Sequence, residues 1–160
     1  MEQKPPASQE PFALLSPEHH TGLLFCWKIR QGLKKKVDTR RIQPYALFFW
    51  DKHLRQHFRE EEIYLFEKVN DDYCWNAMQQ HRNIRASIHQ LKGSSPAQFP
   101  DLLTQLADAV EAHIRYEERE LFPHLEKTLN KSELLLIGAA LEQLHTSPVR
   151  DNFPDEFWVT

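Results

Sequence analysis

A ten-residue segment occurs twice in this chain, and it constrains the fold more than any other feature. Residues 57–66 (HFREEEIYLF) and 113–122 (HIRYEERELF) align at a constant offset of 56, with six of the ten positions identical. Each copy contains H-x-x-x-E, and on a helix positions i and i+4 lie on the same face. Two copies at so long a period do not make a solenoid. We therefore expect two helices that occupy symmetry-related places in one bundle.

The rest of the sequence also predicts helices, because apolar residues recur every three or four positions and no alternating strand pattern is present. Pro123 is expected to kink or end the fourth helix, since its ring removes a backbone donor. Four long helices with short connections are typical of an up-down-up-down bundle. We therefore expect an all-α four-helix bundle with a short fifth C-terminal helix. The predicted helices are residues 16–33, 44–70, 73–92, 100–123 and 132–145.

These helices form one domain, since 160 residues are enough for a single hydrophobic core. We expect a flexible N-terminal segment at residues 1–15, the bundle with its short helix at 16–145, and a C-terminal tail at 146–160. The tail is rich in aromatic residues, including Phe157 and Trp158. Because an exposed aromatic cluster is unfavourable, the tail is expected to pack on the bundle.

Composition excludes several classes of protein. The chain has 4 glycines and contains no G-x-G-x-x-G or G-K-[ST] string, which argues against nucleotide-binding folds. Its 2 cysteines cannot build a disulfide framework. A net charge of −3 gives no bias toward nucleic acid. The start of the chain lacks the apolar core of a signal peptide, and no apolar run approaches the roughly 20 residues of a membrane span. We expect a cytoplasmic protein with no nucleic-acid or membrane partner.

The repeated histidines and glutamates are expected to face the interior of the bundle. His57 and Glu61 share one helical stripe with leucines one turn away on either side, and His113 and Glu117 lie on the equivalent stripe of the fourth helix. In the third helix, His81 lies among apolar residues. The first helix contributes one of two adjacent histidines. Four histidines and two glutamates therefore converge on the core, with at least one of these side chains from each helix.

A metal site explains this convergence better than ordinary core packing does. A lone histidine on an apolar face is usually a hydrogen-bonded core residue, but two buried carboxylates without a cation are harder to accommodate. Each unpaired buried polar group costs roughly 1–3 kcal/mol, and an ionised group costs more. Six such groups would consume most of a total stability of about 5–15 kcal/mol. We therefore expect a pair of bound metal ions.

The residue types narrow the choice of metal. Mixed imidazole and carboxylate ligands suit Fe, Mn, Zn or Cu, while the absence of thiolates argues against a structural zinc site. We expect two histidines on each ion, with Glu61 and Glu117 bridging both ions and a solvent oxygen between them. That arrangement leaves an open position on each ion. An open, redox-capable site is typical of proteins that bind or transform O2, peroxide or NO.

At these residues the chain resembles the hemerythrin-like (HHE cation-binding) family, over about residues 16–125. The resemblance rests on the two H-x-x-x-E-E strings, on the Leu-Phe-Pro that follows the second string, and on a histidine in each preceding helix. It implies a four-helix bundle with a non-haem di-iron centre, whose two Fe ions are bridged by an oxo or hydroxo group; Mn or Zn are alternatives. The implied ligands are His20, His57, Glu61, His81, His113 and Glu117.

The first helix offers two candidates, because His19 and His20 are adjacent and about 100° apart on a helix. Members of the family have apolar residues three, four and seven places after this ligand. His20 is followed at those places by Leu23, Leu24 and Trp27, whereas His19 is followed by a glycine, a leucine and a cysteine. We prefer His20 and keep His19 as the alternative.

The third helix departs from the pattern of oxygen-carrying hemerythrins, which have a second histidine one turn after the first. Here that place is occupied by Arg85, which argues against reversible oxygen carriage. The set of four histidines and two glutamates is more similar to the branch that includes di-iron proteins implicated in repair of iron–sulfur clusters. Those proteins often carry an additional Cys-containing N-terminal domain, which this sequence lacks.

We therefore expect a hemerythrin-like di-iron protein that binds or reacts with a small diatomic molecule or peroxide. Its role would be iron handling, redox or gas sensing, or protection from oxidative or nitrosative stress. One alternative is an enzyme, a di-metal oxidase or peroxidase in which Arg85 orients an anionic intermediate. The other is an interaction or iron-storage module in which the metal is structural or merely held.

Overall fold

The structure is a computed structural model, and it describes residues 11–144 and 150–159. The described residues form helices and connecting turns, with no strand among them, as the apolar periodicity predicts. The bounds of the long elements are α1 Ser16–Lys34, α2 Thr39–Phe49, α3 Arg55–Glu61, α4 Asp72–Gly93, α5 Phe99–Tyr116, α6 Phe122–Thr128 and α7 Lys131–Leu144. The short elements are the 3-10 turns η2 Pro11–Leu15 and η5 Pro96–Gln98, and the π-helical turns η3 Trp50–Leu54, η4 Glu62–Phe66 and η6 Glu117–Leu121.

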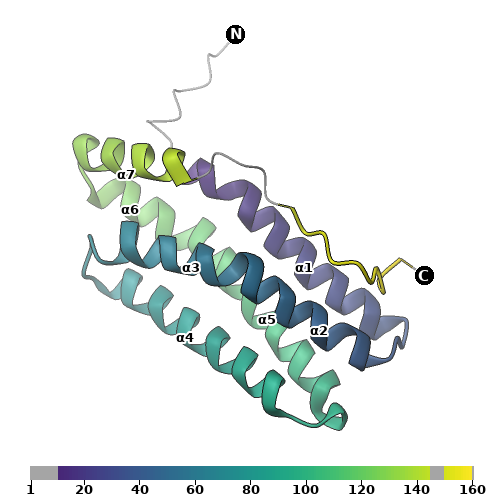
Figure 1. The fold of residues 1–160 in the computed structure, drawn as a ribbon. Helices are drawn as coiled ribbons and strands as arrows, with labels where there is room; N and C mark the ends of the chain where they lie inside the picture. Colours follow the sequence, from purple (N-terminus) through teal and green to yellow (C-terminus); the bar gives the residue numbers. More distant parts are fainter. Residues whose placement is uncertain (1–10, 145–149, 160) are drawn as a thin grey trace.

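The bundle has four long rods that run alternately up and down (Figure 1). The first is α1, the second runs from α2 through α3 to η4, the third is α4, and the fourth runs from α5 through α6. The helix α5 packs against both α1 and α4, and α2 contacts α1, α4 and α5. The prediction of an all-α, up-down-up-down bundle with a short fifth helix is confirmed.

The second rod begins earlier than the sequence pattern predicts. We expected a start near Pro44, but the helix begins at Thr39, where the Asp38 carboxylate accepts a hydrogen bond of 3.0 Å from the backbone N–H of Arg40. Pro44 lies inside the helix and removes only its own N–H from the backbone ladder. A side-chain cap at Asp38 therefore sets the start of this helix.

The fourth rod passes through Pro123, where we expected a kink or an end. The π-helical turn η6 comes directly before α6, so Pro123 occupies the first turn of a new α-helical segment. Proline is tolerated in the first turn of an α-helical segment, because a backbone N–H at that position would have no acceptor within the segment. The rod continues to Thr128, five residues beyond the proline.

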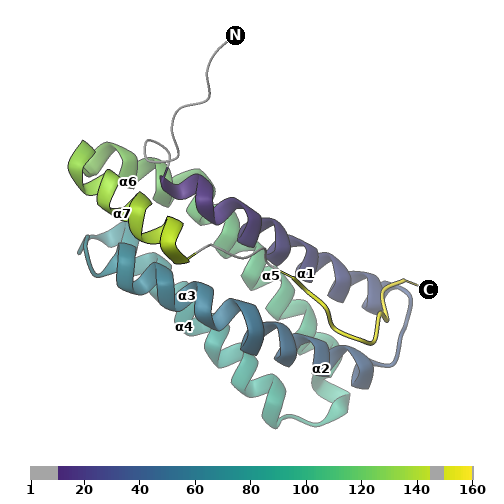
Figure 2. The ribbon, with the colours of Figure 1, turned by 45° about the horizontal axis from the view of Figure 1, so that its top comes forward.

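Both ends of the described chain pack on the bundle. Residues 11–15, which we expected to belong to a flexible segment, form η2 and bury Phe12 and Leu15. Residues 150–159 lie along α1 and α2 (Figure 2), where Phe157 is fully buried with its ring 5.5 Å from that of Tyr45. His145, the predicted end of the fifth helix, lies outside the described residues.

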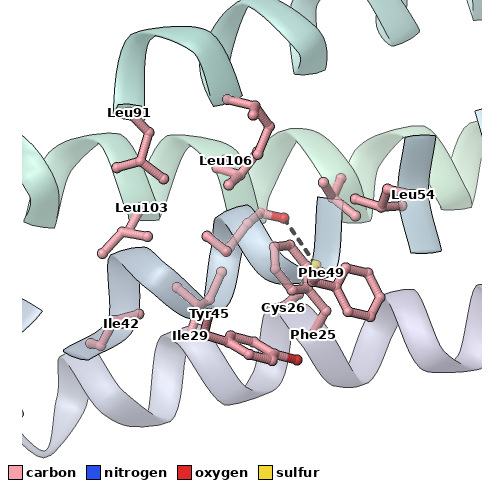
Figure 3. Packing of buried hydrophobic residues seen from close by; sticks show 14 of the residues in the cluster. Phe25, Cys26, Ile29, Ile42, Tyr45, Phe49, Leu54, Leu91, Leu103 and Leu106 are labelled. Atoms are coloured by element: carbon pink, nitrogen blue, oxygen red, sulfur yellow. Dashed lines mark hydrogen bonds between the residues drawn. The ribbon is translucent and has the colours of Figure 1, made fainter. Parts of the chain in front are cut away.

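The larger apolar cluster fills the half of the bundle that contains the α1–α2 connection. In it Phe25 of α1 stacks on Phe49 of α2 with ring centroids 4.4 Å apart, and Leu103 and Leu106 of α5 belong to the same cluster (Figure 3). The thiol of Cys26 donates a hydrogen bond of 3.3 Å to the backbone carbonyl of Ala107. This cluster fixes α1 against α5, and thereby places the site described next.

None of the helices in the described parts of the chain is long and apolar enough to cross a membrane.

Candidate metal centre

A polar layer separates two apolar clusters in the bundle. One cluster includes Leu54 and Val110, and the other includes Leu65 and Leu121. Between them in sequence lie the two copies of H-x-x-x-E. The four helical rods therefore carry their polar residues at one level, with apolar packing above and below.

Six side chains meet in this layer, and none of them is more than 7% exposed. Both glutamates are fully buried, although ionised carboxylates are rarely buried without a partner. The described arginine and lysine side chains that form ion pairs do so elsewhere. The six residues are His19 of α1, His57 and Glu61 of α3, His81 of α4, His113 of α5 and Glu117 of η6.

The six residues form two overlapping groups of four. Each group holds two histidines together with both Glu61 and Glu117, and its ligand atoms lie within 4.8 Å of one another. The first pair of histidines is His19 and His57, and the second pair is His81 and His113. The glutamates lie between the two pairs, so they are placed to bridge two neighbouring ions.

The atoms that face the centre of this cluster lack the hydrogen bonds that buried polar atoms normally make. His19 Nε2, Glu61 Oε2 and both carboxylate oxygens of Glu117 are buried without a hydrogen-bond partner. Most buried polar atoms in proteins are satisfied, so each exception requires an explanation. A cation would serve as the partner of all four atoms at once.

The contact between His81 and His113 fits metal ligation. Their Nε2 atoms lie 3.0 Å apart, and His81 Nε2 lies 3.2 Å from Glu61 Oε1. If two imidazole nitrogens bind the same ion at about 2.1 Å and at right angles to each other, they are separated by about 3 Å. The donor types and their spacing therefore fit a cation coordinated by nitrogen and oxygen.

The outer nitrogen of each histidine has its own hydrogen-bond acceptor. This arrangement fixes the tautomer of the ring, because an Nδ1–H that donates outward leaves the Nε2 lone pair directed at the centre. The pairs are His19 with Glu118 at 3.3 Å, His81 with Glu62 at 3.0 Å, His113 with Gln80 at 2.6 Å, and His57 with Glu18.

The outer acceptors follow the same internal symmetry as the histidines. Glu62 and Glu118 each come directly after an inner glutamate, whereas Glu18 and Gln80 each come directly before a histidine of α1 or α4. Our sequence analysis assigned no role to these four residues. The signal was present, since the second glutamate of both H-x-x-x-E-E strings is an outer acceptor and the residue before His81 has its counterpart in Glu18.

A π-helical turn begins at or directly after each inner glutamate. The turn η4 begins one residue after Glu61, and η6 begins at Glu117 itself. Such turns are rare in proteins overall, but those that occur are often found at functional sites. The wider backbone of the turn changes the direction of the side chains. The repeated sequence therefore has a repeated backbone irregularity at the point where the carboxylates meet.

The electrostatics of the cluster favour neutral imidazoles at His81 and His113. Burial lowers the pKa of His113 to about 3, and burial also lowers the pKa of His81. Burial and the neighbouring Glu117 raise the pKa of Glu61 well above its ordinary value. Neutral imidazole is the form that binds metal, and a cation between the carboxylates would relieve the repulsion that raises the pKa of Glu61.

The prediction that His20 faces the interior is wrong, because the structure exposes His20 and buries His19. The leucine and tryptophan that favoured His20 lie on the surface, with Leu24 39% and Trp27 48% exposed. The inward face of α1 instead carries the small residue Gly22, where an added Cβ would lie 2.8 Å from Ile114 Cδ1. Small residues allow α1 to approach α5 closely, and they hide the buried face from a hydrophobicity pattern.

The structure brings the other five predicted residues together, as the repeat implied. Arg85 is not directed at the cluster, since its guanidinium donates a hydrogen bond of 2.6 Å to Glu62. Glu62 also accepts from His81, so Arg85 supports an outer carboxylate. The suggestion that Arg85 orients an intermediate inside the centre is not supported by this position.

Comparisons with known proteins agree with this reading of the cluster. The family model of the hemerythrin HHE cation-binding domain matches residues 10–125 and again residues 75–146. A protein of Nostoc sp. (strain PCC 7120 / SAG 25.82 / UTEX 2576) described as a DNA nickase is 30% identical to this chain over 107 residues. That match covers 63% of this chain but 30% of the Nostoc protein, so the chain spans less than a third of that relative. No solved structure matches the chain.

Proposed function

Because the chain belongs to the hemerythrin HHE cation-binding family, we propose that it holds two iron ions in the polar layer of its bundle. The observation that carries this proposal is the sharing of Glu61 and Glu117 by two groups of four ligands. In the proposed centre His19 and His57 hold one ion, His81 and His113 hold the other, and the two glutamates bridge them. Manganese or zinc would fit the same donors.

The protein contributes rigidity to this centre. Each imidazole is held by its outer acceptor, so the Nε2 atoms do not have to reorganise when an ion arrives. Aromatic stacking adds to this order, since the ring of Phe58 lies 3.8 Å from that of His81 and Phe122 stacks on His19. A pre-arranged set of imidazole nitrogens and carboxylate oxygens favours binding of a cation.

We further propose that the loaded centre binds or reacts with a small molecule such as O2, NO or peroxide. A pair of redox-active ions supplies the electrons for such chemistry when it is bound. The side chains of the centre are nearly inaccessible, which supports a diatomic or peroxide-sized reactant and argues against a larger substrate. Iron handling, gas sensing and stress protection are roles that use this capacity.

The Nostoc relative does not extend the proposal to DNA. The matched 107 residues make up 30% of that protein, so its described nickase function need not lie in the shared part. The net charge of −3 also provides no general attraction for a phosphate backbone.

The proposal is tested by optical titration of the iron-loaded, chemically reduced protein under anaerobic conditions. Addition of O2, NO or peroxide is expected to change the absorption spectrum, and the change should saturate at about one molecule per ion pair for a binding protein. Sustained consumption of the reactant would favour the oxidase or peroxidase alternative. The absence of a spectral response to all three molecules would contradict the proposed small-molecule chemistry, and would leave an iron-storage or structural role.

A further inference from the structure

A surface groove lies between the second and third rods, outside the metal centre. It encloses about 860 Å³, which falls within the range of small-molecule sites. Its apolar wall includes Phe48 and Trp50 from the second rod and Ile88 from α4. Two aromatic rings beside an aliphatic side chain form a surface on which a planar aromatic molecule can stack.

The groove is also lined by basic side chains. Arg55, Arg85 and Lys92 line it together with a single acid, Asp51. Asp51 pairs with Arg55 at 3.0 Å, and Arg85 pairs with Glu62, which is not among the lining residues. The charge in the groove is therefore positive on balance. A planar aromatic molecule that carries a phosphate or carboxylate would complement both the apolar wall and the basic side chains of the groove.

A chain of aromatic contacts connects this groove to the metal centre. The ring of Trp50 meets that of Phe58 in an edge-on contact, with centroids 5.8 Å apart. Phe58 is buried, and its ring stacks on His81 at 3.8 Å with the planes 11° from parallel. Three rings in succession therefore lead from the groove to a residue whose Nε2 faces the centre.

We propose that this groove binds a planar aromatic anion that acts as an electron donor, and that Trp50 and Phe58 provide the electron path from the donor to the centre at His81. The path rests on the proposed iron centre, whereas binding in the groove does not. In each transfer the anionic reduced ring of the donor loses one electron and becomes a neutral radical. The electron lowers by one the oxidation state of the ion held by His81, so no proton has to cross the protein.

Flavin mononucleotide serves as the probe, because it combines a planar ring with a phosphate. The metal-free protein is expected to quench flavin fluorescence on binding, and riboflavin, which lacks the phosphate, should bind about tenfold more weakly. Trp50→Leu should weaken binding of the mononucleotide by about tenfold or more, since stacking on an aromatic ring contributes roughly that much. The control is Trp75→Leu, because Trp75 is 60% exposed and does not line the groove.

The electron path is tested by stopped-flow reduction of the iron-loaded, oxidised protein with reduced flavin mononucleotide. Phe58→Leu should slow the reduction by at least about tenfold when it is compared with the wild type at equal iron content and equal flavin loading. Phe66→Leu is the matched control, because the ring of Phe66 also lies 5.3 Å from that of His81, whereas Phe66 belongs to the other apolar cluster from the one that Trp50 contacts. Its reduction rate should equal that of the wild type.

The results distinguish failure of the groove, of the electron path and of the proposed iron centre. If the metal-free protein does not bind flavin mononucleotide, or if Trp50→Leu binds it as well as Trp75→Leu does, the groove assignment is overturned and the proposed metal centre is unaffected. If Phe58→Leu and Phe66→Leu are reduced at the same rate, the electron path is overturned. A protein that binds flavin through Trp50 but holds no iron would overturn the proposed function, and the electron path with it.

Discussion

His19 Nε2 lies 3.1 Å from Glu117 Oε1, and this contact joins α1 to the π-helical turn that follows α5. It completes the first group of four ligands, because no other side chain of α1 belongs to that group among the described residues. The adjacent His20 lies on the exposed side of the same helix turn. Substitution of His20 is therefore a matched control for substitution of His19 in tests of metal binding.

We predict that His19→Ala lowers the metal content of the reconstituted protein from two ions per chain to one or fewer. The variant removes one of the two imidazoles that hold the first ion, whereas His20→Ala removes an exposed ring and should retain both ions. Elemental analysis of the two purified variants checks the prediction. Equal metal content in both would contradict the assignment of His19.

Outer carboxylates should contribute to metal affinity even though they do not face the centre. Glu18 accepts a hydrogen bond from His57 Nδ1, and loss of such partners typically lowers metal affinity by roughly 10–100-fold. We expect Glu18→Gln to weaken binding of the first ion by about this factor, as measured by competition with a chelator. Glu67→Gln, at an exposed position, is the control and should bind as the wild type does.

The close approach of α1 to α5 depends on Gly22. A Cβ at this position would lie 2.8 Å from Ile114 Cδ1, so a side chain as large as leucine displaces the Ile114 side chain and crowds α1 against α5. We expect Gly22→Leu to lower the free energy of unfolding by roughly 1–3 kcal/mol, and to weaken metal binding by moving His19 away from Glu117. Chemical denaturation and metal analysis measure the two effects.

The control for this variant is Gly93→Leu, at the exposed end of α4. An added Cβ there meets nothing within 4 Å, so we expect no comparable loss of stability or metal. If the two leucine variants behaved alike, the close packing of α1 on α5 would not be what places His19.

Much of the centre could be predicted from the sequence, because the repeat carries its own geometry. The spacing of H-x-x-x-E places His57 with Glu61, and His113 with Glu117, on single helix faces whatever the details of packing. The first helix could not be oriented in the same way. At the positions three and seven after His19 the buried face carries only Gly22 and Cys26, while Trp27 lies on the surface, so hydrophobicity near the ligand favours the wrong histidine.

The π-helical turns and the outer acceptors were also beyond a reading of periodicity. A π-helical turn depends on local backbone geometry that a period of 3.6 residues does not contain. The partner of an outer nitrogen lies on another rod, as Glu62 does for His81 and Gln80 does for His113. The repeat marks Glu62 and Glu118 as equivalent residues, but which histidine each of them contacts follows from the packing of the rods.

The metal-free protein should lose stability in acid through the buried His113. Burial lowers the pKa of His113 to about 3, so the folded protein binds fewer protons there than the unfolded chain, in which the pKa is near 6.5. Stability from this group is therefore present above pH 6.5 and is lost as the pH falls toward 3. The slope is at most about 1.4 kcal/mol per pH unit for one group.

The control for this prediction is His113→Gln, which keeps a polar side chain but cannot be protonated in this range. Urea unfolding of both metal-free proteins between pH 7.5 and pH 4.5, followed by circular dichroism, should show the wild type losing stability relative to the variant as the pH falls. A difference in the free energy of unfolding that does not change with pH would contradict the prediction.

Metal stoichiometry tests the central claim most directly. The wild-type chain should be reconstituted with ferrous iron under anaerobic conditions, freed of loosely bound metal, and analysed for iron per chain together with Glu61→Ala and Glu117→Ala. The account predicts two irons per wild-type chain, and loss of iron from both sites in each variant, because each glutamate belongs to both groups of ligands. A folded wild-type protein without bound iron, or variants that retain two irons, would contradict it.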